Sequence, residues 1–489
     1  MSSNDIKQKA TSGMFWTAVQ KYSIMAINLI SGIILARLLE PEDYGIIGML
    51  AIFMSIASIS IDAGFGSALI QKKQPTQTDY STIFYFNLGM SGVMYLILFV
   101  CAPAIAKFYH MPILCDVLRV QGIVLFINAL NIIQTNQLRK QLNFKSIAIA
   151  TIVASLVGLV ITVYMAYNHY GVWSLVAQNI TLAGVPTVIY WTITKWRPSV
   201  VFSWQSIKSL FGFGGYMFLT SILNAITGQL NGLLIGRLYN SATMGYFSKA
   251  SSTERMASTS ISGVVSSVSY PVYAIKQDDK NELINIIKRL TSTISFFTTP
   301  LMILLCLIAK PLFVLLYSEK WLPCVPYFQL LCLGGIAVCL HGVNNNVIAA
   351  VGKSNVMFKW TVIKRCVELC LIIAGIMLGG IKGLLIAMVI NNWFIYMVNA
   401  GNVSKYIGYA LVKQIRCLIP IFVVSCVAFI SAYFSVALLK LPLFLDGILK
   451  VIVFVLVYVG WALIFKPEAY TYSLSIFHNV IKQKKESLN

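Results

Sequence analysis

Long apolar segments alternate with short polar ones along the whole chain. Each apolar segment holds about 20 residues, which is the length that an α-helix needs to cross the hydrocarbon core of a membrane. The pattern therefore predicts an all-α membrane protein with about 14 transmembrane helices. The predicted spans are residues 15–38, 44–70, 82–106, 117–136, 147–167, 172–194, 210–234, 244–268, 290–317, 326–351, 360–378, 384–403, 418–438 and 445–465.

The composition supports lipid as the main solvent of the chain. Hydrophobic residues make up 58% of the 489 residues and charged residues only 11%, whereas a globular protein has roughly 25% charged residues. The predicted loops are short, so neither side of the membrane has room for a soluble catalytic domain. The chain also has no D-x-D motif and no cluster of His and Asp. We therefore expect no enzyme activity.

The basic residues fall mainly in alternate loops. The net charge is +21, and most bases lie in the two tails and in every second loop, which is the distribution expected of cytoplasmic segments. This pattern predicts cytoplasmic N- and C-termini, and it fits an anionic membrane surface better than nucleic acid. The opposite loops hold only Arg37, Lys107, Arg237, Lys310, Lys320, Lys382, Lys440 and Lys450.

The cysteines and histidines predict no metal site. Most of the 10 cysteines lie inside apolar segments and form no C-x-x-C pair, and the 4 histidines are scattered. Buried thiols are common as small apolar side chains. The polar segment 1–13 precedes a long apolar run without a small-residue cleavage pattern. It therefore predicts a retained cytoplasmic tail and not a signal peptide.

An internal repeat relates the first predicted span to the seventh. The segment from Gly32 through Arg37 to Gly45 matches the segment from Gly232 through Arg237 to Gly245 at a constant offset of 200 residues. The two copies begin six spans apart and so face the same way across the membrane. A parallel repeat of this kind is typical of a transporter built from two lobes around a central pathway.

The repeat predicts four parts of the chain. The first six-helix lobe takes residues 1–194, and an interfacial linker with two tryptophans takes residues 195–208. The second lobe takes residues 209–404. A C-terminal helix pair and a cytoplasmic tail, residues 405–489, stand outside the repeat.

The eighth predicted span carries charges inside the bilayer, where charges are costly and normally face a wet cavity. Arg255 lies about 12 residues, or ~18 Å, from the predicted outer end, which is near the bilayer midplane. Glu254 points about 100° away and so faces another helix or the cavity's edge. In the structural alternative, Glu254 and Arg255 only neutralise each other's environment. The polar residues that recur at helical spacing predict one stripe. They are Ser248, Ser251, Ser252, Arg255, Ser258, Thr259, Ser262 and Ser266.

Five further charges are candidates for the cavity, each with a structural alternative. Lys21 and Lys249 lie nearer the ends of their spans, from which they can also reach the interface. Asp62 is a candidate coupling or gating acid, or a carboxylate that ends a helix near two lysines. Arg37 and Arg237 end the repeated spans at the outer face, as ligands or as anchors. A cavity with net positive charge would suit a headgroup that carries phosphate.

Several segments, in a consistent order, resemble the Wzx-type polysaccharide exporters, which belong to the multidrug/oligosaccharidyl-lipid/polysaccharide superfamily. The resemblance is strongest to the branch of colanic-acid and teichuronic-acid exporters. It runs from the N-terminus through the tenth predicted span. The segments that carry it are Ser12-Gly-Met-Phe-Trp16, Leu35-Ala-Arg-Leu-Leu39, Asp62-Ala-Gly-Phe-Gly66, Leu69-Ile-Gln-Lys-Lys73, Gln137-Leu-Arg-Lys-Gln-Leu-Asn-Phe144, Tyr270-Pro271, Glu319-Lys-Trp321 and Phe328-Gln-Leu-Leu331.

This resemblance implies two pseudo-symmetric lobes in a V around a central cavity, in a bacterial inner membrane. It implies a flippase that moves undecaprenyl-pyrophosphate-linked oligosaccharide from the cytoplasmic to the periplasmic leaflet by alternating access, for capsule, exopolysaccharide or O-antigen of lipopolysaccharide. Lys21, Lys249 and Arg255 would be cavity cations. A separate polymerase and a chain-length regulator are the candidate protein partners. The resemblance implies no cofactor, is compatible with proton or sodium coupling, and fixes neither ion.

Three alternatives stay open at the level of sequence. A lipid II flippase has the same physical task with a different headgroup. A multidrug antiporter of the same superfamily would require carboxylates in the cavity, where the first span offers Lys21. A membrane glycan polymerase or ligase is the alternative from a different class, and it would require a catalytic residue in a substantial extramembrane loop.

Overall fold

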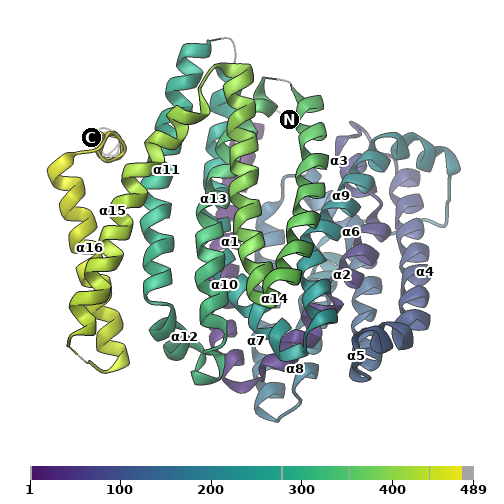
Figure 1. Cartoon of the computed structure of the whole chain (residues 1–489). Helices are drawn as coiled ribbons and strands as arrows, with labels where there is room; N and C mark the ends of the chain where they lie inside the picture. The colour runs from purple at the N-terminus through teal and green to yellow at the C-terminus, as the bar shows by residue number, and fades with distance from the viewer. Residues whose placement is uncertain (1–2, 277–278, 352, 440, 476–489) are drawn as a thin grey trace, which may run out of the picture. The chain divides into compact units, whose positions relative to one another are not determined.

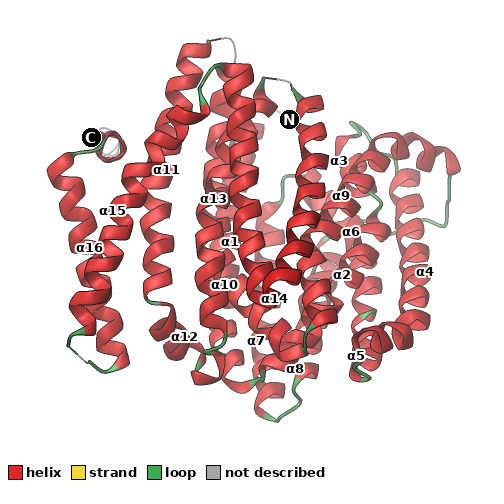
Figure 2. Ribbon diagram, viewed as in Figure 1, coloured by secondary structure: helices red, strands yellow, loops and turns green. Residues whose placement is uncertain are grey.

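The computed structural model describes residues 3–276, 279–351, 353–439 and 441–475. Within these ranges the chain forms α-helices, one short 3-10 turn and no strand (Figure 2). The predicted basic C-terminal tail, from residue 476 onward, lies outside the described residues. The helices are α1 Ser3–Leu38, α2 Pro41–Asp62, α3 Phe65–Gln71, α4 Gln77–Tyr109, α5 Ile113–Gln121, α6 Ile123–Lys140, α7 Phe144–Tyr167, α8 Val172–Ile193, α9 Trp204–Leu238, α10 Ser241–Ile275, α11 Lys280–Leu307, α12 Ala309–Tyr317, η1 Glu319–Trp321, α13 Cys324–Ala350, α14 Ser354–Ile407, α15 Leu411–Ala437 and α16 Leu443–Phe465.

The predicted class of all-α membrane protein is confirmed. Among the described residues, 12 helical stretches are long and apolar enough to cross a membrane. One of them, Lys359–Ile407, contains two predicted spans. The serine-rich helix α10 is not among the 12, because its polar residues lower its hydropathy. The count of about 14 spans stays a prediction.

The long helix α14 is two helices joined at a pair of glycines. Gly379 and Gly380 have non-helical backbone angles, and Gly380 adopts φ 57° and ψ −136°, a region open essentially to glycine alone. Across this turn, a Cβ on Gly375 would overlap the backbone carbonyl of Gly383. Two further glycines therefore let the two halves of the hairpin pack with their backbones in contact.

The chain divides into two compact units, residues 1–248 and 249–489. In the first unit α1 packs on α7, α7 on α8, and α6 on α4 and α8, while α9 packs against α2, α3 and α4. In the second unit α13 packs on α11 and α14, and α15 lies between α11 and α16 (Figure 1). Packing in one conformation does not test which helices move together, so the predicted lobe boundaries stay a prediction.

The interfacial linker is bound along the first turns of α4. The indole Nε1 of Trp196 donates to Gln77 Oε1 at 2.6 Å, and Gln77 Nε2 donates to the carbonyl of Arg197 at 2.8 Å. Further along, the backbone N–H of Ser199 donates to Ser81 Oγ at 3.0 Å. These bonds satisfy polar groups in the part of the linker that precedes α9, residues 195–203, which forms no helix.

The repeated glycines bring the starts of α2 and α10 into reciprocal contact within the first unit. A Cβ on Gly45 would overlap the carbonyl oxygen of Ser241, and a Cβ on Gly245 would overlap the carbonyl oxygen of Pro41. Both pairs obey the offset of 200 residues, so the same contact occurs twice with the roles of the two helices exchanged. We call Gly45 and Gly245 the glycine seam.

The glycine seam predicts a specific sensitivity to side-chain volume. We expect Gly245→Ala to destabilise the protein relative to Gly228→Ala, because Gly228 has nothing within 4 Å of a built Cβ. Both substitutions raise the intrinsic helix propensity by the same amount. Overpacking at Gly245 additionally lowers the free energy of unfolding by about 1–3 kcal/mol. Thermal unfolding of the purified protein in detergent measures the difference, and equal midpoints for the two variants would contradict the seam.

Candidate functional site

Helix α10 presents polar residues on two faces, and this corrects the prediction of one continuous stripe. Ser252, Arg255 and Thr259 are exposed, whereas Ser251, Glu254 and Ser258 are buried. The two sets follow the same helical spacing on neighbouring sides of the helix. The side chain of Ser266, the last member of the predicted stripe, lies outside the described residues.

The exposed face of α10 is the part of the second unit that most resembles a site for a charged ligand. Arg255 lies between the exposed side chains of Ser252 and Thr259, and Thr259 Oγ1 donates back to the carbonyl of Arg255 at 2.5 Å. An exposed guanidinium in the middle of a transmembrane helix is costly against lipid. The row of hydroxyls around it fits a water-lined surface.

Glu254 points into the second unit instead. Its side chain is 7% exposed, and its Oε1 atom has no hydrogen-bond partner among the described residues. The carboxylate occupies the space beside Gly335, where a Cβ would collide with Oε1 and approach Met302 Sδ. Gly335 therefore provides the room that this buried carboxylate requires.

Lys249 is also enclosed by the second unit. Its side chain is 5% exposed, and its ammonium lies 4.0 Å from the ring centroid of Tyr317 and 5.6 Å from that of Trp321. Thr253 Oγ1 lies 3.2 Å from the hydroxyl of Tyr317 and holds that ring in place. Cation–π contacts of a desolvated ammonium are worth about 2 kcal/mol, so the aromatic rings stabilise this buried charge.

In the first unit, Lys21 lies on an exposed polar face of α1. Thr17 and Asn28 are exposed on the same helix, one and two turns away. Helix α9 carries a second polar face in this unit, with Thr220 and Asn224 exposed one turn apart.

The other predicted candidates hold structural contacts. Asp62 Oδ1 accepts the backbone N–H of Gly66 at 3.0 Å, which fixes the turn between α2 and α3. Arg237 is exposed, with Nη1 3.1 Å from His110 Nδ1 at the end of α4. Arg37 is exposed at the end of α1. The contact of Asp62 fits its alternative as a carboxylate that ends a helix, and the contact of Arg237 fits its alternative as an anchor; the roles of all three residues stay predictions.

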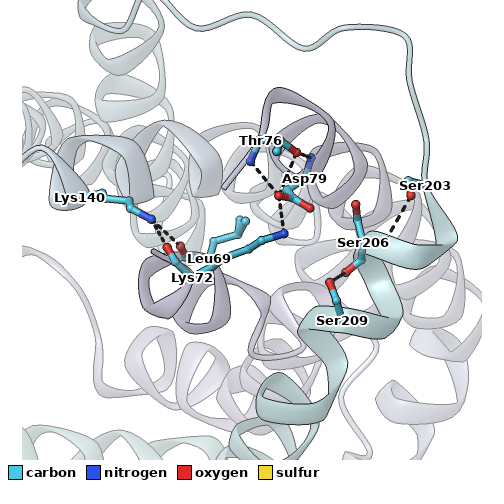
Figure 3. A network of polar contacts seen from close by, with 8 residues as sticks. All are labelled: Leu69, Lys72, Thr76, Asp79, Lys140, Ser203, Ser206 and Ser209. Carbon is cyan, nitrogen blue, oxygen red and sulfur yellow. Dashed lines mark hydrogen bonds and ion pairs between the residues drawn. The ribbon is translucent and has the colours of Figure 1, made fainter. Parts of the chain in front are cut away.

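A buried carboxylate that the sequence analysis missed lies at the start of α4 (Figure 3). Asp79 is 2% exposed, and its Oδ2 accepts the ammonium of Lys72 at 2.7 Å and the backbone N–H of Thr76 at 2.8 Å. Lys140 donates to the carbonyls of Leu69 and Lys72. The signal in the sequence was the T-x-x-D capping box ahead of an apolar run.

A family model described as "Polysaccharide biosynthesis protein" matches residues 34–326. The chain is 24% identical to the teichuronic acid biosynthesis protein TuaB of Bacillus subtilis, over 73% of this chain and 74% of that protein. It is 23% identical to the lipopolysaccharide biosynthesis protein WzxC of Escherichia coli, over 83% and 84%. Among solved structures, the lipid II flippase MurJ in an inward closed conformation has TM-score 0.74 at 14% identity, over 92% of this chain and 98% of that one.

The network at the start of α4 predicts a loss of stability when its charge is removed. We expect Asp79→Asn to lower the free energy of unfolding by about 1.5–3 kcal/mol, since charge-assisted hydrogen bonds contribute that much. Asp116→Asn is the matched control, because Asp116 is exposed on α5. Chemical unfolding in detergent gives the comparison, and a shift no larger than that of the control would show that Lys72 does not depend on this carboxylate.

Proposed function

Since this chain belongs to the polysaccharide biosynthesis protein family, we propose that it is a flippase for undecaprenyl-pyrophosphate-linked oligosaccharide repeat units. The exposed face of α10 carries the proposal. Arg255 there offers a planar cation with several N–H donors, which matches the oxygens of a pyrophosphate. Ser252 and Thr259 add hydroxyls that hydrogen-bond to sugar or phosphate.

The relatives and the charge pattern support the proposed direction of transport and the proposed biological product. TuaB and WzxC are named for teichuronic acid and lipopolysaccharide, both polymers of the cell surface. Short loops rich in lysine and arginine support cytoplasmic termini in a bacterial inner membrane. We therefore propose export from the cytoplasmic to the periplasmic leaflet. A polymerase and a chain-length regulator are the proposed partners that act on the exported repeat units.

The mechanism is alternating access without bond chemistry. Lobes 1–194 and 209–404 move about the interfacial linker and open a cavity to one side at a time. The headgroup crosses against Arg255 and Lys21, while the polyprenyl tail stays in lipid. Each unpaired charge would cost several kcal/mol in hydrocarbon, so the fixed cations and hydroxyls replace the lost water.

The buried charges of the second unit have a different task from the exposed ones. Glu254 and Lys249 are enclosed and cannot contact a headgroup in this conformation. They fix the rotation of α10 about its axis, because each has its own space or aromatic contacts on the packed side. Their burial turns Arg255 toward the exposed side.

Coupling to a proton or sodium gradient belongs to the same proposal, with Asp62 and Glu254 as the candidate acids.

Complementation of a strain that lacks its polysaccharide flippase tests the proposal. We expect the wild-type chain to restore surface polymer, and Arg255→Ala and Lys21→Ala to reduce it roughly tenfold or more, in line with the loss of about 1.5–3 kcal/mol per charge-assisted contact. Arg255→Lys keeps the charge and should retain part of the export. Lys107→Ala, an exposed base at the end of α4, is the control at matched membrane levels.

The outcomes separate the function from the site. Rescue by wild type and equally by every variant would keep the flippase and reject Arg255 and Lys21 as ligands. Failure of the wild type in strains with several different polysaccharides would reject the substrate class. Rescue of a strain depleted of its lipid II flippase would then favour that alternative, and drug resistance without polymer would favour the antiporter.

A further inference from the structure

Two pockets flank the turn between α6 and α7 in the first unit. The pockets share Gln141 and Asn143 as a common wall. Asn143 is held in this wall because its Oδ1 accepts the backbone N–H of Ser146 at 3.2 Å and caps α7. The proposed export mechanism uses neither pocket.

The first pocket, of about 620 Å³, contains two lysines and a tryptophan. Its lining includes Lys140 from α6 and Lys195 and Trp196 from the interfacial linker. Lys140 is oriented by the two carbonyls of α3 to which it donates, and its third N–H remains for a ligand. Lys195 is exposed, and no acidic residue occurs in the described lining.

The second pocket, of about 430 Å³, repeats this composition on the other side of the wall. Its lining includes Lys9 and Trp16 from α1 and Lys145 from the start of α7. The ammonium of Lys145 lies 5.5 Å from the ring centroid of Trp16. Asp and Glu are again missing from the described lining. Each pocket thus combines two cations, amide groups and one indole.

This composition fits the phosphates of a lipid better than a soluble anion. Tryptophan concentrates at the membrane–water interface, and basic pockets between transmembrane helices at the cytoplasmic face are typical sites of anionic lipid headgroups. The lysines belong to the segments whose basic residues predict the cytoplasmic side. Because two pockets share one wall, a single headgroup with two linked phosphates can fill both.

We propose that this double pocket binds a diphosphatidylglycerol lipid of the cardiolipin type, with one phosphate beside Lys140 and Lys195 and the other beside Lys9 and Lys145. The site goes beyond the proposed function and does not depend on it. A lipid with one phosphate would fill one pocket only. The proposal therefore predicts tighter binding of cardiolipin than of phosphatidylglycerol.

Native mass spectrometry of the full chain in detergent tests the proposal by titration with cardiolipin, phosphatidylglycerol and phosphatidylcholine. We expect wild type to bind cardiolipin at least tenfold more tightly than phosphatidylglycerol. The double variants Lys140→Gln/Lys195→Gln and Lys9→Gln/Lys145→Gln should each lose that tenfold preference. Lys405→Gln/Lys413→Gln is the control, since these two bases, which flank the loop between α14 and α15, line neither pocket.

The result that would overturn the proposal is equal affinity for the two anionic lipids, or an equal loss in the pocket and control variants. Displacement of cardiolipin by inorganic pyrophosphate at comparable concentration would assign the pockets to a soluble anion instead. Lys140 also contacts α3, so Lys195→Gln alone repeats the measurement with a side chain that makes no such contact. Its thermal midpoint should equal that of wild type while its preference for cardiolipin falls.

Discussion

The hydrocarbon core of a membrane contains no water to satisfy a polar group, and most of this structure follows from that constraint. The backbone meets it by forming helices over most of each predicted span, with short breaks after Asp62, Gln121 and Leu307. Buried charged side chains have individual partners: Lys249 makes a cation–π contact with Tyr317, and Asp79 forms an ion pair with Lys72. The exposure of Arg255 stands out in comparison, because Lys249 and Glu254 on the same helix are buried. The same constraint is the reason why we propose this face as the site of a polar ligand.

Much of the fold could be predicted from the sequence, because the length and hydropathy of a span are local properties. Each predicted span is helical, although three of them, 44–70, 117–136 and 290–317, are each divided over two consecutive helices. The repeat at an offset of 200 residues recurs in the structure, because α1 and α9 end at Leu38 and Leu238, and α2 and α10 begin at Pro41 and Ser241. The hairpin within α14 was also predictable as two spans. Its sharp turn was not, since the role of Gly380 depends on a backbone angle that only the three-dimensional path reveals.

The environment of each site residue could be predicted less well. Helical spacing gives the angle between Glu254 and Arg255, but it does not say which neighbouring helix covers which face. Packing by α11 and α13 decides that, and these helices begin 25 or more residues later in the chain. Lys249 shows the same limit, because the aromatic residues around it lie on separate elements. Close packing of glycines is equally non-local: the offset of 200 residues identifies Gly45 and Gly245 as equivalents, but not as partners in space.

The linker's attachment to α4 sets an order of events during synthesis. Trp196 and its partner Gln77 are separated by 119 residues, which a ribosome adds in roughly 6–24 s at about 5–20 residues per second. During that interval the first turns of α4 are already at the membrane surface without the segment that will cover them. A chaperone that binds nascent membrane proteins would have this interval in which to bind the first turns of α4. The covering of α4 therefore depends on translation of the linker and not only on insertion of α4 itself.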